Sequence, residues 1–136
     1  SCGALKMAQK NAELHGLLNM CEFIEGDITK EMPKRKFDLI VSNPPYIHPS
    51  LRGKLQTEVN HEPEMALFAE EDGLLFYRHI ANEYKTVLKK NGYLVFEYGF
   101  DQQTAVRNIL RDAGYTVIKE IIDLGGNPRG VVAQKQ

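Results

Sequence analysis

The sequence predicts an α/β fold with a mostly parallel sheet. Short apolar runs alternate with segments of helical periodicity, in the order α-β-β-α-β-α-β-β. No helix separates the last two apolar runs, so these runs should form an antiparallel strand pair. The 136 residues are 43% apolar and 26% charged, which is ordinary for one globular domain.

The N-terminal part is predicted to hold one helix and two strands. Residues 4–15 carry apolar side chains at helical spacing and precede a glycine, a favourable helix stop. Residues 20–25 are expected to form a short strand, because Cys21 and Phe23 would share an apolar face. Residues 38–42 contain three consecutive apolar residues, Leu39, Ile40 and Val41, and indicate a buried strand.

The middle of the chain predicts a long helix followed by a strand. Residues 72–90 have one apolar face that includes the packing residue Tyr77, with lysines in the expected last turn. Asn91-Gly92 should end that helix. Residues 93–98 read as a strand, and its charged Glu97 is either satisfied by backbone donors or faces a ligand cleft.

The C-terminal part predicts a helix and the last two strands. Asp101 is a suitable N-cap for a helix over residues 105–113. Residues 115–121 and 129–134 are strand-like and are joined by a turn-rich connection.

Composition and charge narrow the functional class without excluding a local basic patch. A net charge of -1 provides no bulk attraction to nucleic acid, and no apolar run approaches a membrane span. Cys2 and Cys21 lack metal-ligand spacing and fit the reduced thiols of a cytoplasmic protein. His61 lies in a long aperiodic segment, where a surface position is favoured over a base or metal ligand, so no metal is predicted.

The candidate catalytic feature is Asn43-Pro44-Pro45-Tyr46, directly after the strand at 38–42. Two successive prolines cannot donate to a sheet ladder and fix their own φ angles, so the turn is stiff. Asn43 is therefore expected to present an amide at the end of a strand, where open α/β sheets bind ligands. Tyr46 adds an aromatic ring with a polar tip. The alternative is a plain proline-rich exit turn.

Asp27 follows the expected strand at residues 20–25 and has two possible roles. It is either a turn or helix-cap residue, or an acceptor for the amino group of an adenine. Local sequence leaves both roles open.

Five sequence blocks together resemble the HemK/PrmC family, the glutamine methyltransferases of peptide chain release factors. The resemblance runs from Ser1 to about Val132. The blocks are Asn43-Pro44-Pro45-Tyr46-Ile47, Glu62-Pro63-x-x-Ala66-Leu67, Glu71-Asp72-Gly73-Leu74 with Tyr77-Arg78-x-Ile80, Asp123-Leu124-Gly125, and Pro128-Arg129.

This resemblance implies a Rossmann-like fold and S-adenosylmethionine as the cofactor. The Asn43 side-chain carbonyl and the Pro44 backbone carbonyl would accept hydrogen bonds from the substrate amide, and Tyr46 would pack against that amide. Pro45 would complete the substrate-binding turn. Asp27 and Ile28 would lie near the adenine, and Asn43 would also lie beside the cofactor. The implied protein partner is a peptide chain release factor.

The resemblance also implies that residues 1–136 are part of a methyltransferase catalytic domain, without the first strands and the Gly-rich loop. We therefore expect this chain alone to be inactive and to show no binding of S-adenosylmethionine in a calorimetric titration. Its exposed sheet edges could support self-association. The alternatives are a nucleic-acid amino methyltransferase and a non-catalytic fragment.

Overall fold

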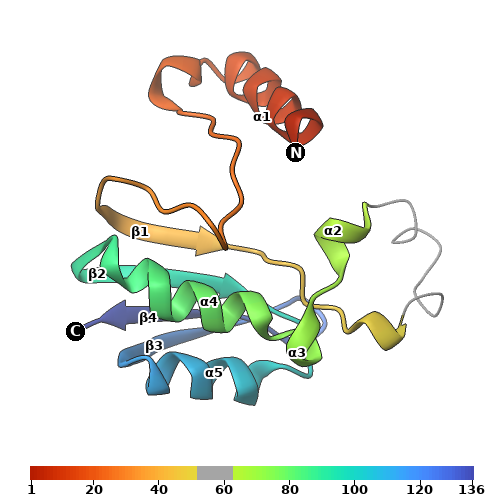
Figure 1. Ribbon diagram of the computed structural model, residues 1–136. Helices are drawn as coiled ribbons and strands as arrows, with labels where there is room; N and C mark the ends of the chain where they lie inside the picture. The colour runs from red at the N-terminus through yellow and green to blue at the C-terminus, as the bar shows by residue number, and fades with distance from the viewer. Residues whose placement is uncertain (52–62) are drawn as a thin grey trace. The chain divides into compact units, whose positions relative to one another are not determined.

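The structure, a computed structural model, describes residues 1–51 and 63–136 and contains two compact units, Ser1–Met32 and Pro33–Gln136 (Figure 1). His61 lies outside the described residues. In the described part, no helix is both long and apolar enough to cross a bilayer.

The first unit is built around the predicted N-terminal helix, α1 (Cys2–Leu14). Ser1 caps this helix, because its side-chain oxygen accepts a hydrogen bond from the Ala4 N–H at 3.5 Å. The helix ends next to Gly16, which has a left-handed φ of +68°. A short 3-10 helix, η1 (Leu18–Met20), follows.

The strand predicted over residues 20–25 is wrong. Met20 ends η1, and the following residues have no strand assignment. Met20 and Ile24 are 82% and 64% exposed, so the face opposite Cys21 and Phe23 is not buried. An isolated extended segment needs a neighbouring strand for its backbone hydrogen bonds, and the described part of the first unit contains none.

The second unit contains a four-stranded sheet with the order β1-β2-β4-β3. The strands are β1 (Phe37–Ser42), β2 (Leu88–Glu97), β3 (Tyr115–Ile122) and β4 (Pro128–Lys135). β1 pairs with β2 in parallel, and β4 is antiparallel to both β2 and β3. The open α/β sheet and the antiparallel C-terminal pair are therefore confirmed.

Two helices, α4 (Leu75–Glu83) and α5 (Gln103–Asp112), pack on one face of this sheet (Figure 1). The ring of Tyr77 is fully buried and meets the Phe96 ring edge to face, with centroids 5.1 Å apart, which confirms its packing role. The other large, fully buried core side chains are Leu88, Leu94, Tyr98, Val106, Leu110 and Val131.

The other face of the sheet exposes apolar side chains. Leu39 and Val41 of β1 are 52% and 65% exposed, and Tyr93 of β2 is 42% exposed. β1 is also an end strand of the described sheet. These features agree with the expected exposed edge, and self-association through it stays a prediction.

The helix predicted over residues 72–90 is shorter at both ends in the structure, because α4 begins only at Leu75, after the left-handed residues Asp72 and Gly73. α4 stops at Glu83, and a 3-10 helix, η4 (Tyr84–Thr86), separates it from β2. Lys89 and Lys90, which were expected in the last helical turn, lie in β2.

Pairing with β1 explains this early end. The Phe37 N–H donates to the Val87 carbonyl at 2.8 Å, and Lys89 Nζ lies 2.9 Å from both carboxylate oxygens of Asp38. Asn91, part of the predicted helix stop, has a φ of +62° inside β2. Strand pairing has therefore overridden a local helix signal.

The predicted helix near residues 105–113 is confirmed as α5, but the Asp101 cap is wrong. Gln102 occupies the N-cap position and makes no side-chain cap hydrogen bond. Its backbone N–H instead donates to the Gly99 carbonyl at 2.8 Å, which closes a turn just before the helix.

Candidate active site

The turn at Asn43 leaves the sheet where β1 ends. Ser42 makes the last pairing of β1, opposite Phe96 of β2. Asn43 is exposed, Pro44 is buried, and Pro45 and Tyr46 are half-buried. In residues 1–51 and 63–136, the Asn43 side-chain amide has no hydrogen-bond partner. Its carbonyl oxygen and amino group are therefore available to a ligand.

Ile47 anchors the far side of this turn. Its N–H donates to the Leu67 carbonyl at 2.9 Å, and its carbonyl accepts from the Ala69 N–H at 2.9 Å. These bonds form a parallel bridge at the end of the short helix α2 (Glu64–Leu67). Backbone hydrogen bonds therefore hold the segment on both sides of the two prolines.

The side chain of Gln102 joins this turn to two other segments. Its Nε2 donates to the Tyr46 carbonyl at 3.0 Å and to the Asp72 carbonyl at 3.4 Å. Its Oε1 accepts from the Gly99 N–H at 3.1 Å. One carboxamide thus satisfies backbone groups of three chain segments.

The segment beside Tyr46 has an uncommon backbone conformation. In α3 (Glu70–Gly73), Glu71, Asp72 and Gly73 have φ values of 55°, 57° and 79°. Left-handed backbone at non-glycine residues costs about 1–2 kcal/mol each. A Cβ atom added to Gly73 would lie 2.0 Å from the Tyr46 carbonyl oxygen, so only glycine fits there.

The Tyr46 ring packs against the apolar core of the second unit. A Cβ atom on Gly99 would lie 3.4 Å from its Cδ2, which places the ring over the loop before α5. The buried Tyr77 hydroxyl donates to the Glu97 carbonyl at 2.8 Å, and burial raises the Tyr77 pKa. Packing of Tyr46 against a substrate amide stays a prediction.

An open hollow of about 230 Å³ lies at the carboxyl ends of β1 and β2. Apolar side chains of the sheet line part of it. Its polar lining residues include Asn43, Glu97 and Arg129. Glu97 is exposed, and its carboxylate has no hydrogen-bond or ion-pair partner within the described residues. Of the two alternatives for Glu97, the structure supports the one in which it faces a cleft.

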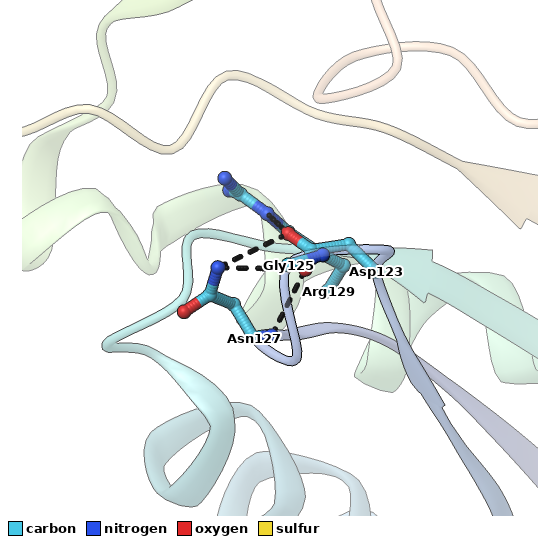
Figure 2. A network of polar contacts seen from close by, with 4 residues as sticks. All are labelled: Asp123, Gly125, Asn127 and Arg129. Carbon is cyan, nitrogen blue, oxygen red and sulfur yellow. Dashed lines mark hydrogen bonds and ion pairs between the residues drawn. The ribbon is translucent and has the colours of Figure 1, made fainter.

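Asp123 fixes the position of the Arg129 guanidinium (Figure 2). Asp123 Oδ1 accepts hydrogen bonds from the Gly125 N–H at 2.8 Å and the Asn127 N–H at 2.9 Å. Asp123 Oδ2 accepts from Arg129 Nε at 3.0 Å. In Figure 2 the outer nitrogens of the guanidinium point away from the 123–127 loop. No acceptor for them is found within residues 1–51 and 63–136, so they can donate to further acceptors.

These contacts predict a pH-dependent contribution of Asp123 to stability. Hydrogen bonds from the Asn127 N–H and the Arg129 guanidinium hold the pKa of Asp123 below its ordinary value of 3.8. A lowered folded-state pKa stabilises the fold above the ordinary pKa, and this contribution is lost as pH falls through the folded-state pKa. Urea unfolding should show the largest deficit of Asp123→Asn at pH 7 and a shrinking deficit below about pH 4. A deficit independent of pH would contradict this prediction.

Asp27 and Ile28, the predicted adenine-binding residues, lie in the first unit. Asp27 Oδ1 accepts from the Thr29 N–H at 3.0 Å and from its hydroxyl at 2.7 Å, and Oδ2 pairs with Lys30 at 2.9 Å. The Lys30 and Thr29 contacts lower the Asp27 pKa. This is the geometry of a turn-capping aspartate, the first of its two predicted roles. The adenine contact stays a prediction.

Sequence reasoning does not identify the roles of Gln102 and Arg129. Gln102 carries no motif, because its partners are backbone groups far away in the chain. Arg129 enters only as part of a matching block. The available signal is an aspartate and an arginine on either side of a glycine-rich turn, which favours an ion pair across a hairpin. No group of three or more potential metal-ligating side chains occurs among the described residues.

Residues 1–125 match the family described as "Methyltransferase domain". The chain is 41% identical over 133 residues to a bifunctional methyltransferase of Rickettsia felis, covering 97% of this chain and 25% of that protein. It is 41% identical over 134 residues to a release factor glutamine methyltransferase of Fusobacterium nucleatum, covering 97% of this chain and 38% of that protein. The chain therefore spans less than half the length of these relatives.

Among solved structures, a methyltransferase from Pyrococcus furiosus has a similar fold. The TM-score is 0.64 at 17% sequence identity, and the match covers 99% of this chain and 59% of that structure. At this identity the likeness is one of fold alone.

Proposed function

This chain belongs to the methyltransferase domain family, and on that premise we propose that it takes part in methylating a glutamine side-chain amide in a peptide chain release factor. The observation that carries the proposal is the Asn43 amide, exposed at the end of β1 on a proline-stiffened turn and lining the hollow. The 41% identity to a relative named for this reaction supports the choice of substrate.

The turn suits the chemistry of an amide nitrogen. Such a nitrogen is a poor nucleophile, because its lone pair is delocalised into the carbonyl group. Asn43 Oδ1 and the Pro44 carbonyl would accept the two amide hydrogens and hold the nitrogen in line for transfer. These acceptors would also favour the positive charge that develops on the nitrogen as it gains the methyl group. One of the two amide protons would then leave to solvent, since the product keeps a single N–H. The contribution of the chain is therefore position and electrostatic complementarity.

The proposed cofactor, S-adenosylmethionine, would supply an activated methyl group. Asp27 and Ile28 are proposed to contact its adenine. A carboxylate offers about four acceptor sites. Thr29 uses two of them on Asp27 and Lys30 uses a third, so the residue retains capacity for an adenine amino group. The remaining acceptor capacity of Asp27 is therefore compatible with this role.

The remaining proposals follow from the same resemblance. We propose that residues 1–136 supply part of a catalytic domain that works in the cytoplasm with a release factor as its protein substrate. Methylation of nucleic-acid amino groups is the alternative, since the same kind of turn serves it. The net charge of -1 favours the protein substrate.

A labelling experiment tests the substrate. The complete protein that contains these residues would be incubated with methyl-labelled S-adenosylmethionine and, in separate reactions, a release factor, DNA and RNA. We expect label in the release factor and its loss when the target glutamine is replaced with alanine. Label that appears in nucleic acid and not in the release factor would support the alternative function.

A further inference from the structure

We propose that Glu97 and Arg129 form a binding site for a main-chain peptide group of the substrate, next to the Asn43 amide. This inference rests on the proposed function and adds how the polypeptide around the methylated side chain is held. All three residues line the same hollow.

Arg129 is prepared to donate hydrogen bonds into this hollow. Its Nε is occupied by Asp123 at 3.0 Å, and Asp123 is itself fixed by two backbone N–H groups. The Arg129 backbone is fixed too, because its carbonyl accepts from the Tyr98 N–H at 3.0 Å. A guanidinium held in this way binds a carbonyl oxygen at a small entropic cost, since its planar fork is already oriented.

Glu97 supplies the complementary acceptor. It is the last residue of β2 and pairs with Gly130 of β4, the neighbour of Arg129. No ion pair joins the Glu97 carboxylate to Arg129 among the described residues. Both charged groups therefore keep hydrogen-bonding capacity for a ligand in the hollow.

The two groups match the chemistry of a peptide unit. A peptide group has one N–H donor and one carbonyl acceptor. Glu97 would accept from the N–H, and Arg129 would donate to the carbonyl. Their opposite charges cancel, so the site does not depend on a net charge of the substrate. Asn43, in the same hollow, would hold the side-chain amide of the same residue.

The test uses the complete protein and a synthetic peptide that spans the methylated glutamine. Two analogues carry a methyl group on a main-chain nitrogen, one at the glutamine and one at the following residue. For the unmodified enzyme we expect at least one analogue to raise KM roughly tenfold, because a hydrogen bond to a charged group is lost. For Glu97→Ala the same analogue should change KM less than about twofold relative to the natural peptide.

Arg129→Ala should raise KM for the natural peptide roughly tenfold and leave kcat within about threefold. Arg129→Lys keeps the positive charge but loses the planar guanidinium, so its KM should lie between the KM of the native enzyme and that of Arg129→Ala. Asp123→Asn should raise KM in the native background and have no further effect with Arg129→Ala, as expected of a positioning residue. Arg107→Ala is the matched control, because Arg107 pairs with Glu120 at 3.2 Å and lies outside the hollow.

Three outcomes are decisive. If the enzyme methylates the peptide but neither analogue nor any variant changes KM, the main-chain site is rejected while the proposed function stands. If free L-glutamine, with its ammonium and carboxylate groups, is a better substrate than the peptide, the site binds a free amino acid and the proposal is overturned. If no glutamine is methylated in any substrate, the proposed function itself fails.

Discussion

Replacing Asn43 with alanine in the complete protein is expected to lower kcat for methyl transfer by about 10²–10³, as for other positioned polar groups at a reacting centre. The variant loses the side-chain acceptor on the turn after β1, while the backbone hydrogen bonds of Ile47 stay in place. Radiolabel transfer to a release factor measures kcat, and calorimetric titration measures cofactor affinity. Affinity should change little, because the lost group acts on the amide nitrogen.

Two variants sharpen the Asn43 result. Asn43→Asp keeps an acceptor oxygen at the same place and should retain more activity than Asn43→Ala. Asn82→Ala removes an amide that, among the described residues, donates to the Arg78 carbonyl on α4 at 2.9 Å and to no other group, and should leave kcat unchanged. Turnover of Asn43→Ala equal to that of the native protein would refute the assigned role.

Replacing Gly73 with alanine should destabilise the second unit by about 2–4 kcal/mol. Two terms add. The φ of +79° costs about 1 kcal/mol with a side chain present. The new Cβ would also lie 2.0 Å from the Tyr46 carbonyl oxygen and 2.7 Å from Gln102 Nε2. The first of these contacts is with a backbone atom, so the backbone near Tyr46 or Gly73 would have to shift. Urea unfolding monitored by circular dichroism gives the free energy of unfolding.

Gly126→Ala separates the two terms. Gly126 has nearly the same φ, +83°, but a Cβ atom there would meet nothing within 4 Å. Its cost should be only the backbone term, about 1 kcal/mol. Equal losses for the two variants would mean that the contact with Tyr46 contributes nothing. A larger loss for Gly73→Ala, together with lower methyl transfer, would link this glycine to the geometry of the turn.

The order of elements could largely be predicted because most of them carry their own periodicity. Local patterns of apolar residues predict α1, α5 and the last two strands. The short connection between β3 and β4 predicts that these two strands pair in the antiparallel direction. The end of α4 could not be predicted, because the fate of Lys89 is decided by Asp38 in a distant strand. The segment at 20–25 has a weak strand pattern and, in the described unit, no partner to pair with.

The candidate site divides in the same way. The Asn43 turn is visible in the sequence, because two prolines after an apolar run determine local conformation. The roles of Gln102 and Arg129 depend on the tertiary fold. Gln102 binds backbone groups distant in the sequence, and Arg129 lines a hollow with distant residues. For Asp27, local geometry matches the ordinary turn-capping role, which local sequence could not distinguish from a ligand contact.

The Gln102 carboxamide has a consequence for synthesis. It binds the Tyr46 carbonyl across 56 positions of the chain and closes the contact between Tyr46 and the left-handed turn at Asp72. Chains emerge from the ribosome from the N-terminus onward, so the Asn43 turn is synthesised before the Gln102 side chain that contacts it. The contact between Gln102 and the Tyr46 carbonyl therefore forms only after residue 102 has been made, and a nascent chain arrested before Gln102 carries the motif without this contact.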